Sequence, residues 1–235
     1  MTSTAFQLAR ESTKQAISDN RISHHMFHGP ATDEYWCQKS KIAIVNLESY
    51  GYQECGLVNV DYGTLHGWML NINRRIRTVR NSVALASVIL KGIRESVVIS
   101  ESELAHAYRD TKRLEATLRV IAYYNINGTS NSVTQQNLKM ISKSGDGAVG
   151  ACVGKEILSL DANIILVSGR GGCDAINSML GLSGRLSYLS STEISNSLTI
   201  FSIRHPSRPK YVEYARVAKD ACLAVAMQRS SNSNH

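Results

Sequence analysis

The chain has 235 residues, of which 43% are hydrophobic and 19% charged, and its formal net charge is +7. This composition excludes a disordered chain, a disulfide-rich scaffold and a membrane protein, and the length fits one domain spanning residues 1–235. Because residues 1–10 contain no apolar run typical of a secretory signal, we expect a cytosolic protein. The excess of positive charge favours a polyanionic partner.

Short β-branched runs alternate with stretches of helical periodicity along the chain. In chain order, the patterns predict a helix at 5–17, a strand at 41–45, helices at 83–94 and 102–119, a strand at 120–124, a helix at 149–160, a strand at 163–168, a helix at 174–180, a strand at 197–203 and a helix at 211–227. Such alternation is typical of an α/β protein. We therefore expect a three-layer α/β/α fold with a central four-stranded, mainly parallel sheet. We also expect an N-terminal helix and irregular segment at 1–40 and a disordered tail at 229–235.

Polar side chains follow three of the four predicted strands. Glu48 and Tyr50 follow the first strand, Asn125 and Asn127 the second, and His205 the last. Ligands bind at the carboxyl ends of the strands in an open parallel sheet, so we expect these side chains at one edge. Each residue type also has a simpler interpretation: a solvated loop carboxylate, amides that cap a strand end, and a histidine in an ordinary turn.

The last junction reads His205-Pro206-Ser207 directly after an apolar run, which fixes an imidazole at a rigid turn. The first junction, residues 46–51, reads Asn-Leu-Glu-Ser-Tyr-Gly. In order and spacing, residues 41–227 resemble the uracil-DNA glycosylase superfamily, whose fourth strand ends in His-Pro-Ser and whose first loop opens with Gly-Gln-Asp-Pro-Tyr-His or a variant. The resemblance implies a uracil-DNA-glycosylase-like fold and a DNA partner, with no metal and no cofactor.

The resemblance further implies a monofunctional DNA glycosylase, an enzyme that flips a base out of the duplex and hydrolyses its N-glycosidic bond. Glu48 stands at the catalytic acidic position, and His205 stands where the family donates to the base oxygen. Tyr50 matches the tyrosine that walls the base pocket. Asn125 matches the residue of the second strand that reads the base, and Asn127 is an alternative for that role.

A flipped base also needs an aromatic partner and further polar contacts. Tyr62 is the best placed aromatic residue after the first loop, and Trp68 is the second candidate. An isolated aromatic residue is more often part of the core, which is the alternative for both. Asn46 offers one more polar group to the base.

Basic residues near the histidine are expected to follow DNA phosphates. Together with their neighbours in the last loop and one residue of the glycine-rich turn at 169–172, they give the predicted DNA contacts Arg204, Ser207, Arg208, Lys210, Tyr211 and Arg170. Pro209 or Tyr211 would act as the wedge that enters the duplex. A second basic stretch is either a phosphate-binding surface or a solvated helix face, and it comprises Arg74, Arg75, Arg77 and Arg80.

Departures from the family pattern bear on the substrate. Ser49 and Gly51 are small and leave room for a larger base, and some members of the superfamily remove glucosylated cytosine from phage DNA and so protect bacteria. We therefore expect action on hypermodified cytosine, with repair of uracil or another deaminated base as the alternative. Two further classes stay open: a non-catalytic nucleic-acid-binding domain would explain the charge, and a nucleotide-dependent oxidoreductase would explain the glycine-rich turn.

The cysteine pattern does not favour a metal site. The five cysteines lie far apart with no Cys-x-x-Cys pair, which predicts reduced and mostly buried thiols. His24, His25 and His28 have no cysteine or carboxylate partner at ligand spacing. We expect a monomer that binds DNA and no membrane.

Overall fold

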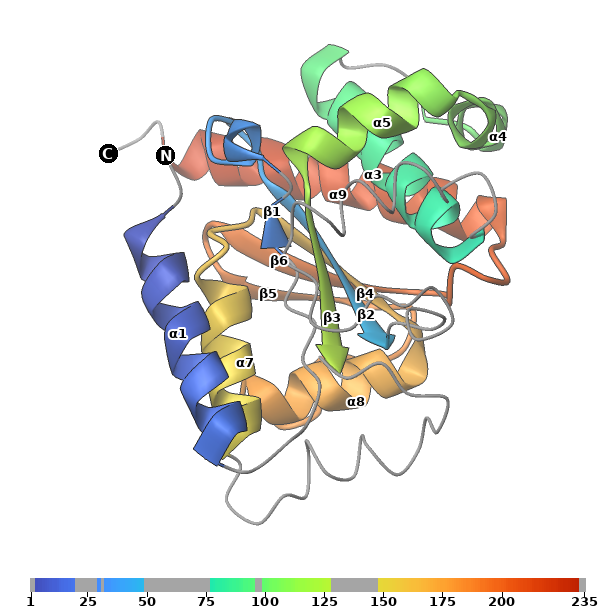
Figure 1. Ribbon diagram of the computed structural model, residues 1–235. Helices are drawn as coiled ribbons and strands as arrows, with labels where there is room; N and C mark the ends of the chain where they lie inside the picture. The colour runs from blue at the N-terminus through green and yellow to red at the C-terminus, as the bar shows by residue number, and fades with distance from the viewer. Residues whose placement is uncertain are drawn as a thin grey trace.

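The computed structural model describes residues 3–19, 29–30, 32–48, 77–95, 99–127 and 148–232. Among these residues the strands form one mixed six-stranded sheet in the order β1-β3-β2-β4-β6-β5 (Figure 1). In chain order the strands are β1 (Gly29–Pro30), β2 (Ile42–Glu48), β3 (Ala122–Asn127), β4 (Ile164–Ser168), β5 (Ser191–Ser195) and β6 (Leu198–Ile203). The inner four pair in parallel, and β1 and β5 pair antiparallel at the two edges. The predicted α/β class is confirmed. The prediction of a four-stranded sheet is incomplete, because the sheet has two further strands, β1 and β5, at its edges.

The edge strands carry little sequence signal. Strand β1 consists of a glycine and a proline, which are both depleted in strands. Strand β5 reads Ser-Thr-Glu-Ile-Ser, and only Thr192 in it is buried. A short polar run with one buried side chain has the composition of a loop, so its pairing with β6 could not be read from the sequence.

Helices cover both faces of the sheet (Figure 1). One face carries α3 (Arg77–Glu95), α4 (Glu101–Arg109), α5 (Thr111–Val120) and α9 (Tyr211–Asn232), and the other carries α1 (Thr4–Asp19), α7 (Ala148–Leu158) and α8 (Gly169–Met179). A short 3-10 helix, η1 (Asp33–Tyr35), precedes β2. In the described part of the chain, no helix has both the length and the apolar character that a membrane span requires.

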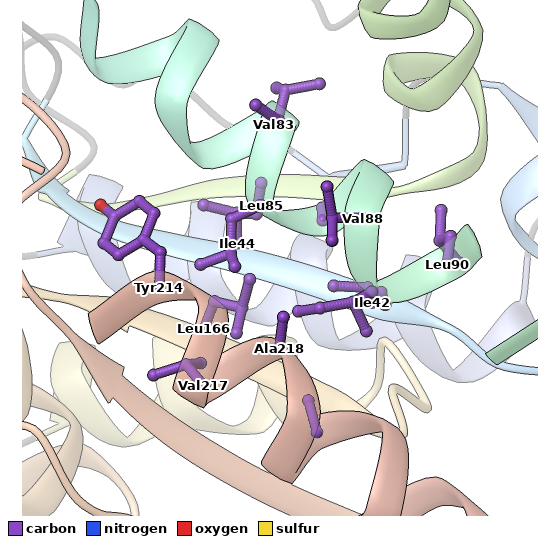
Figure 2. Packing of buried hydrophobic residues seen from close by; sticks show 14 of the residues in the cluster. Ile42, Ile44, Val83, Leu85, Val88, Leu90, Leu166, Tyr214, Val217 and Ala218 are labelled. Carbon is purple, nitrogen blue, oxygen red and sulfur yellow. The ribbon is translucent and has the colours of Figure 1, made fainter. Parts of the chain in front are cut away.

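Two hydrophobic clusters fill the spaces between the sheet and its helices. Along β2, Ile42 and Ile44 belong to the cluster under α3 and α9, and Ala43 and Val45 belong to the opposite cluster. Figure 2 shows the first cluster, in which side chains of β2 lie between those of α3 and α9. Because successive strand side chains point to opposite faces, a strand that is apolar throughout must be covered on both sides.

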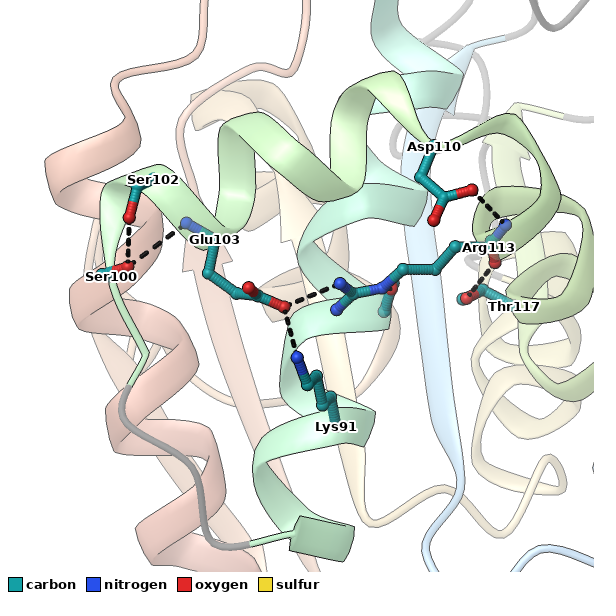
Figure 3. Close-up of polar contacts among 8 residues, drawn as sticks. Lys91, Ser100, Ser102, Glu103, Asp110, Arg113 and Thr117 are labelled. Atoms are coloured by element: carbon teal, nitrogen blue, oxygen red, sulfur yellow. Dashed lines mark hydrogen bonds and ion pairs between the residues drawn. The ribbon is translucent and has the colours of Figure 1, made fainter.

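The predicted helix at 102–119 is two helices, because Asp110 has extended backbone angles (φ −82°, ψ 93°). Its side chain accepts a hydrogen bond from the backbone N–H of Arg113 at 3.0 Å and so caps α5. Across this break, Arg113 donates to Glu103 Oε1 at 2.7 Å, and Lys91 of α3 donates to the same oxygen at 3.1 Å (Figure 3). One carboxylate therefore connects α3, α4 and α5.

Helices α3, α8 and α9 extend several residues beyond their predicted bounds, and α3 begins at Arg77 instead of residue 83. Helix α8 begins at Gly169 instead of residue 174, so the glycine-rich turn forms its first turn, and Gly169 has a φ of +74° that suits glycine. Helix α9 continues to Asn232, where a disordered tail from residue 229 was predicted. Arg229 in this extension donates to Ser40 Oγ at 2.9 Å, which attaches the end of α9 to the segment before β2.

The prediction of mostly buried cysteines is wrong for the described residues. Only Cys173 is buried; Cys152 and Cys222 are intermediate and Cys37 is exposed. All four are free thiols, and Cys55 lies outside the described residues.

Replacing Leu85 with alanine is expected to lower the free energy of unfolding by about 2–5 kcal/mol, because the side chain is fully buried between α3 and the sheet and its loss leaves a cavity. Denaturant unfolding followed by circular dichroism measures the change. Leu8 on α1 is 66% exposed and serves as the control: Leu8→Ala is expected to change stability by less than about 0.5 kcal/mol. Equal effects of the two substitutions would contradict the packing.

Candidate functional site

The sheet has a topological switch point between β2 and β4. From β2 the chain connects to β3 on one side, and the next parallel strand, β4, pairs with β2 on the other side. In open α/β sheets ligands bind in the crevice at the carboxyl ends of the strands at such a point. The candidate residues Asn46, Glu48 and His205 lie in or directly after strands that end at this edge.

The backbone register brings the predicted base-reading residues next to the predicted catalytic carboxylate. Asn46 pairs with Asn125, and Glu48 pairs with Asn127. The structure describes the backbone of Glu48, Asn125 and Asn127, and their side chains lie outside the described part. The register therefore supports the expectation of one shared edge, and it does not choose between Asn125 and Asn127.

Asn46 is a buried amide at this edge, with only 3% of its surface exposed. The hydroxyl of Ser168, at the end of β4, donates to Asn46 Oδ1 at 2.5 Å. Within the described residues, the Nδ2 group of Asn46 has no hydrogen-bond partner. Buried N–H groups normally have a hydrogen-bond partner, and one without a partner costs about 1–3 kcal/mol.

The turn after β6 holds the His205 ring in one tautomer. The backbone N–H of Ser207 donates to Nδ1 of His205 at 3.3 Å, and the Ser207 hydroxyl lies 2.8 Å from the same atom. Because a backbone N–H can only donate, Nδ1 is an acceptor and the neutral ring carries its proton on Nε2. Desolvation lowers the pKa of His205 below its ordinary value of 6.5, and the positive charge of Arg208 lowers it further. Both effects favour the neutral form of this exposed ring, and its favoured tautomer has one N–H donor, Nε2–H.

Helix side chains hold the backbone on both sides of His205. Nδ2 of Asn81, in α3, donates to the carbonyl of Pro206 at 2.8 Å, and the hydroxyl of Tyr214, in α9, donates to the carbonyl of Arg204 at 3.0 Å. Both helix residues are buried. The sequence does not indicate these two supporting residues, because Asn81 lies before the predicted helix at 83–94 and Tyr214 fits the pattern of the predicted helix at 211–227.

Arg204 forms a two-point ion pair inside the protein. Its Nε and Nη2 atoms donate to the two carboxylate oxygens of Glu213 at 2.7 and 3.0 Å. Hydrogen bonding from Arg204 lowers the pKa of Glu213, and Lys210 lies 3.7 Å from the same carboxylate. Arg208 is exposed and belongs to no ion pair among the described residues. Of the three predicted phosphate contacts in this loop, Arg208 is therefore the most available.

The remaining predicted DNA contacts have internal partners. The Tyr211 hydroxyl lies 3.5 Å from Oδ1 of Asn81, and its ring packs against the core, where burial raises its pKa. Arg170, in the first turn of α8, is exposed and lies with its guanidinium 5.1 Å from the ring centroid of Tyr188. The position of Tyr211 suits support of the turn better than insertion into a duplex.

The second basic stretch divides into two environments. Arg77 is exposed at the start of α3, whereas Arg80 is buried, donates to the Tyr108 carbonyl at 2.6 Å and lies over the Tyr108 ring. The interpretation as a solvated helix face is therefore wrong for Arg80. Several predicted residues lie outside the described part of the chain: Tyr50, Tyr62, Trp68, Arg74 and Arg75. Across the described ranges, no three His, Cys, Asp or Glu side chains are grouped so as to hold a metal ion.

Arg208→Gln is expected to raise the pKa of His205 toward its ordinary value, because the substitution removes one of the two causes that lower it. The NMR chemical shift of the ring Cε1–H, followed against pH, measures the change. Arg208→Lys keeps the positive charge and is expected to keep the lowered pKa. A pKa that is the same in all three proteins would show that the guanidinium does not act on the ring.

Asn81→Ala is expected to loosen the His205 turn, because it leaves the Pro206 carbonyl without its buried donor, a loss of about 1–3 kcal/mol. Hydrogen exchange of the Arg208 amide, which donates to the His205 carbonyl at 3.0 Å, reports the opening of this turn. Ser82→Ala is the control, since the Ser82 hydroxyl donates to the Thr78 carbonyl within α3. Unchanged Arg208 exchange in Asn81→Ala would refute the support role.

Comparisons of this chain with protein-family models, with curated proteins and with solved structures found no match. The functional interpretation therefore rests on the residues and the geometry of this edge of the sheet.

Proposed function

We propose that the chain is a monofunctional DNA glycosylase, which hydrolyses the N-glycosidic bond of a flipped base and leaves an abasic site. The observation that carries the proposal is the neutral His205 imidazole, held as an Nε2–H donor at the carboxyl edge of the parallel strands. The same edge carries Glu48 at the end of β2, beside Asn127 of β3. A fixed donor and a carboxylate at one edge are the two groups that this reaction needs.

Bond cleavage produces two opposite charges. The sugar becomes oxocarbenium-like and positive, and the departing base becomes negative. The Nε2–H group of His205 donates a hydrogen bond to the base oxygen where that negative charge develops. Glu48 stabilises the sugar cation and orients the attacking water. A neutral imidazole suits this role because it donates without being an acid that must be reprotonated.

Recognition of the base uses donors at the same edge. The Nδ2 group of Asn46, which has no hydrogen-bond partner within the described residues, provides a buried donor to a base oxygen, and Asn125 or Asn127 provides a second polar contact. Tyr50 and Tyr62 bound the base and stack on it. Arg208, Lys210 and Arg170 follow the phosphates, and flipping a weakly paired or modified base costs a few kcal/mol.

The substrate that we propose is a hypermodified, glucosylated cytosine of phage DNA, so that the enzyme acts in defence against phage. Small residues at 49 and 51 support a wide pocket. The test is excision from matched duplexes that carry uracil or glucosylated hydroxymethylcytosine at one position, with abasic sites scored by alkaline cleavage and released bases identified by mass. Release of uracil alone would refute the wide pocket and favour ordinary repair. DNA binding without any base release would favour a non-catalytic binding domain.

His205→Ala is expected to lower the single-turnover excision rate by about 10²–10³-fold with little change in DNA affinity, because the donor acts on charge that develops only in the transition state. Glu48→Gln is expected to remove most excision while the fold stays intact. His106→Ala and Glu101→Gln, on α4, are the matched controls and are expected to retain the activity. Undiminished excision by either site variant would remove that residue from the mechanism.

A further inference from the structure

A turn at 187–190, immediately before β5, lies at the same edge of the sheet as His205. The backbone N–H of Leu189 donates to Ser202 Oγ at 3.1 Å, and the backbone N–H of Ser202 donates to the Ser190 carbonyl at 2.8 Å. Ser202 belongs to β6, the strand that leads into His205. Because β5 runs antiparallel to β6, the chain that precedes β5 lies at the carboxyl end of β6. The structure thus adds a segment to the candidate site that the strand pattern of the sequence does not indicate.

Hydrogen bonds within the turn fix its shape. Ser190 Oγ accepts from the backbone N–H of Ser187 at 3.0 Å and donates to the Ser187 carbonyl at 2.7 Å. Leu189 has a φ of +63°, in the left-handed region that a bulky side chain rarely adopts. Such a backbone conformation persists only where the surrounding contacts determine it, and it clusters at functional sites. The turn therefore gives Tyr188, its second residue, a set position.

Tyr188 connects the core to a cation beside His205. The Tyr188 ring is half-buried against the hydrophobic cluster on the α8 face of the sheet, and the guanidinium of Arg170 lies over it, 5.1 Å from the ring centroid. Arg170 follows Gly169, at which an added Cβ atom would lie 3.7 Å from Cδ2 of His205. The first turn of α8 and the His205 ring are therefore neighbours.

The contact that holds Arg170 differs from those of the other basic residues at this edge. Arg204 uses two donors on the Glu213 carboxylate, and Lys210 lies 3.7 Å from the same carboxylate. A carboxylate holds a cation and offsets its charge, whereas an aromatic ring attracts a cation through its quadrupole and has no net charge. Arg170 is exposed and belongs to none of the ion pairs found among the described residues. It is therefore held in place with its charge uncompensated.

We propose that Tyr188 is a positioning residue, which holds the Arg170 guanidinium at this edge so that it binds a phosphate of the DNA strand. A guanidinium that is already oriented loses less side-chain entropy when its N–H donors bind a phosphate. With exposed Arg208 after β6, Arg170 gives the strand contacts on two different elements beside His205. The ligand rests on the proposed DNA-binding function, but no step of base excision enters the argument.

The test is binding of the full chain to a fluorescein-labelled DNA duplex with one mismatched base pair, measured by fluorescence anisotropy at several salt concentrations. Arg170→Gln is expected to weaken binding and to reduce the slope of log K against log salt by about 0.9, the value for one phosphate contact. Tyr188→Leu keeps the charge of Arg170, so it is expected to weaken binding about two- to fivefold with an unchanged slope. Tyr188→Phe keeps the ring and is expected to bind as the original chain does.

A double-substitution cycle separates positioning from a general structural role. If Tyr188 acts through Arg170, Tyr188→Leu has no further effect on affinity in the Arg170→Gln protein. Tyr188→Met, a second variant without a ring, is expected to behave as Tyr188→Leu, and thermal melting checks the fold of each. Lys155→Gln, at an exposed position of α7, is the control for charge and is expected to keep the slope.

Several outcomes would overturn the inference: absence of DNA binding, unchanged affinity in Tyr188→Leu, an equal loss in Tyr188→Phe, or additive effects of Tyr188→Leu and Arg170→Gln. Excision is scored separately on the uracil and glucosylated duplexes. Excision combined with any of these binding results would refute the positioning role and keep the glycosylase proposal. The expected binding effects without excision would support the positioning role and refute the glycosylase.

Discussion

Burial of the central strands on both faces is the constraint on which the rest of the structure depends. Every residue of β4, and Ile42 to Asn46 of β2, is buried. Such strands require helices on both faces, and their polar side chains are found mainly at the strand ends. Asn46 and Ser168 are the first polar residues reached along the two strands, and they bond to each other. The position of the candidate site at this edge thus follows from the apolar character of the strands.

The same constraint explains which elements the sequence predicts. The four inner strands appear as mainly apolar, β-branched or aromatic runs, so their positions follow from composition within a few residues. The break between α4 and α5 at Asp110 cannot be predicted from the apolar pattern. The helical spacing of buried side chains continues across it, through Leu104, Ala107, Leu114 and Leu118. The first turn of α8 was likewise missed, since glycine has low helix propensity although the first turn tolerates it.

The candidate site divides in a similar way. Residues that follow strands, such as Glu48 and His205, are predictable because parallel strands end at one edge. The residues that support the His205 turn are not predictable in this way. Asn81 precedes Pro206 by 125 positions and reaches it only because α3 packs on the sheet. Arg204 illustrates a limit of charge patterns: its position beside His205 suggests a phosphate contact, but the two-point bond to Glu213 depends on how α9 begins.

For the proposed reaction, the neutrality of His205 is held by independent causes that DNA binding affects in opposite directions. A phosphate on Arg208 would offset its charge and so raise the pKa of the ring, whereas the covering duplex would remove water and lower it. Desolvation is already the larger cause of the lowered pKa. The Ser207 N–H adds a further constraint, because protonation of Nδ1 would place two donors against each other. In the proposed complex the Ser207 N–H therefore favours the Nε2–H form of the ring, which is the form that the departing base requires.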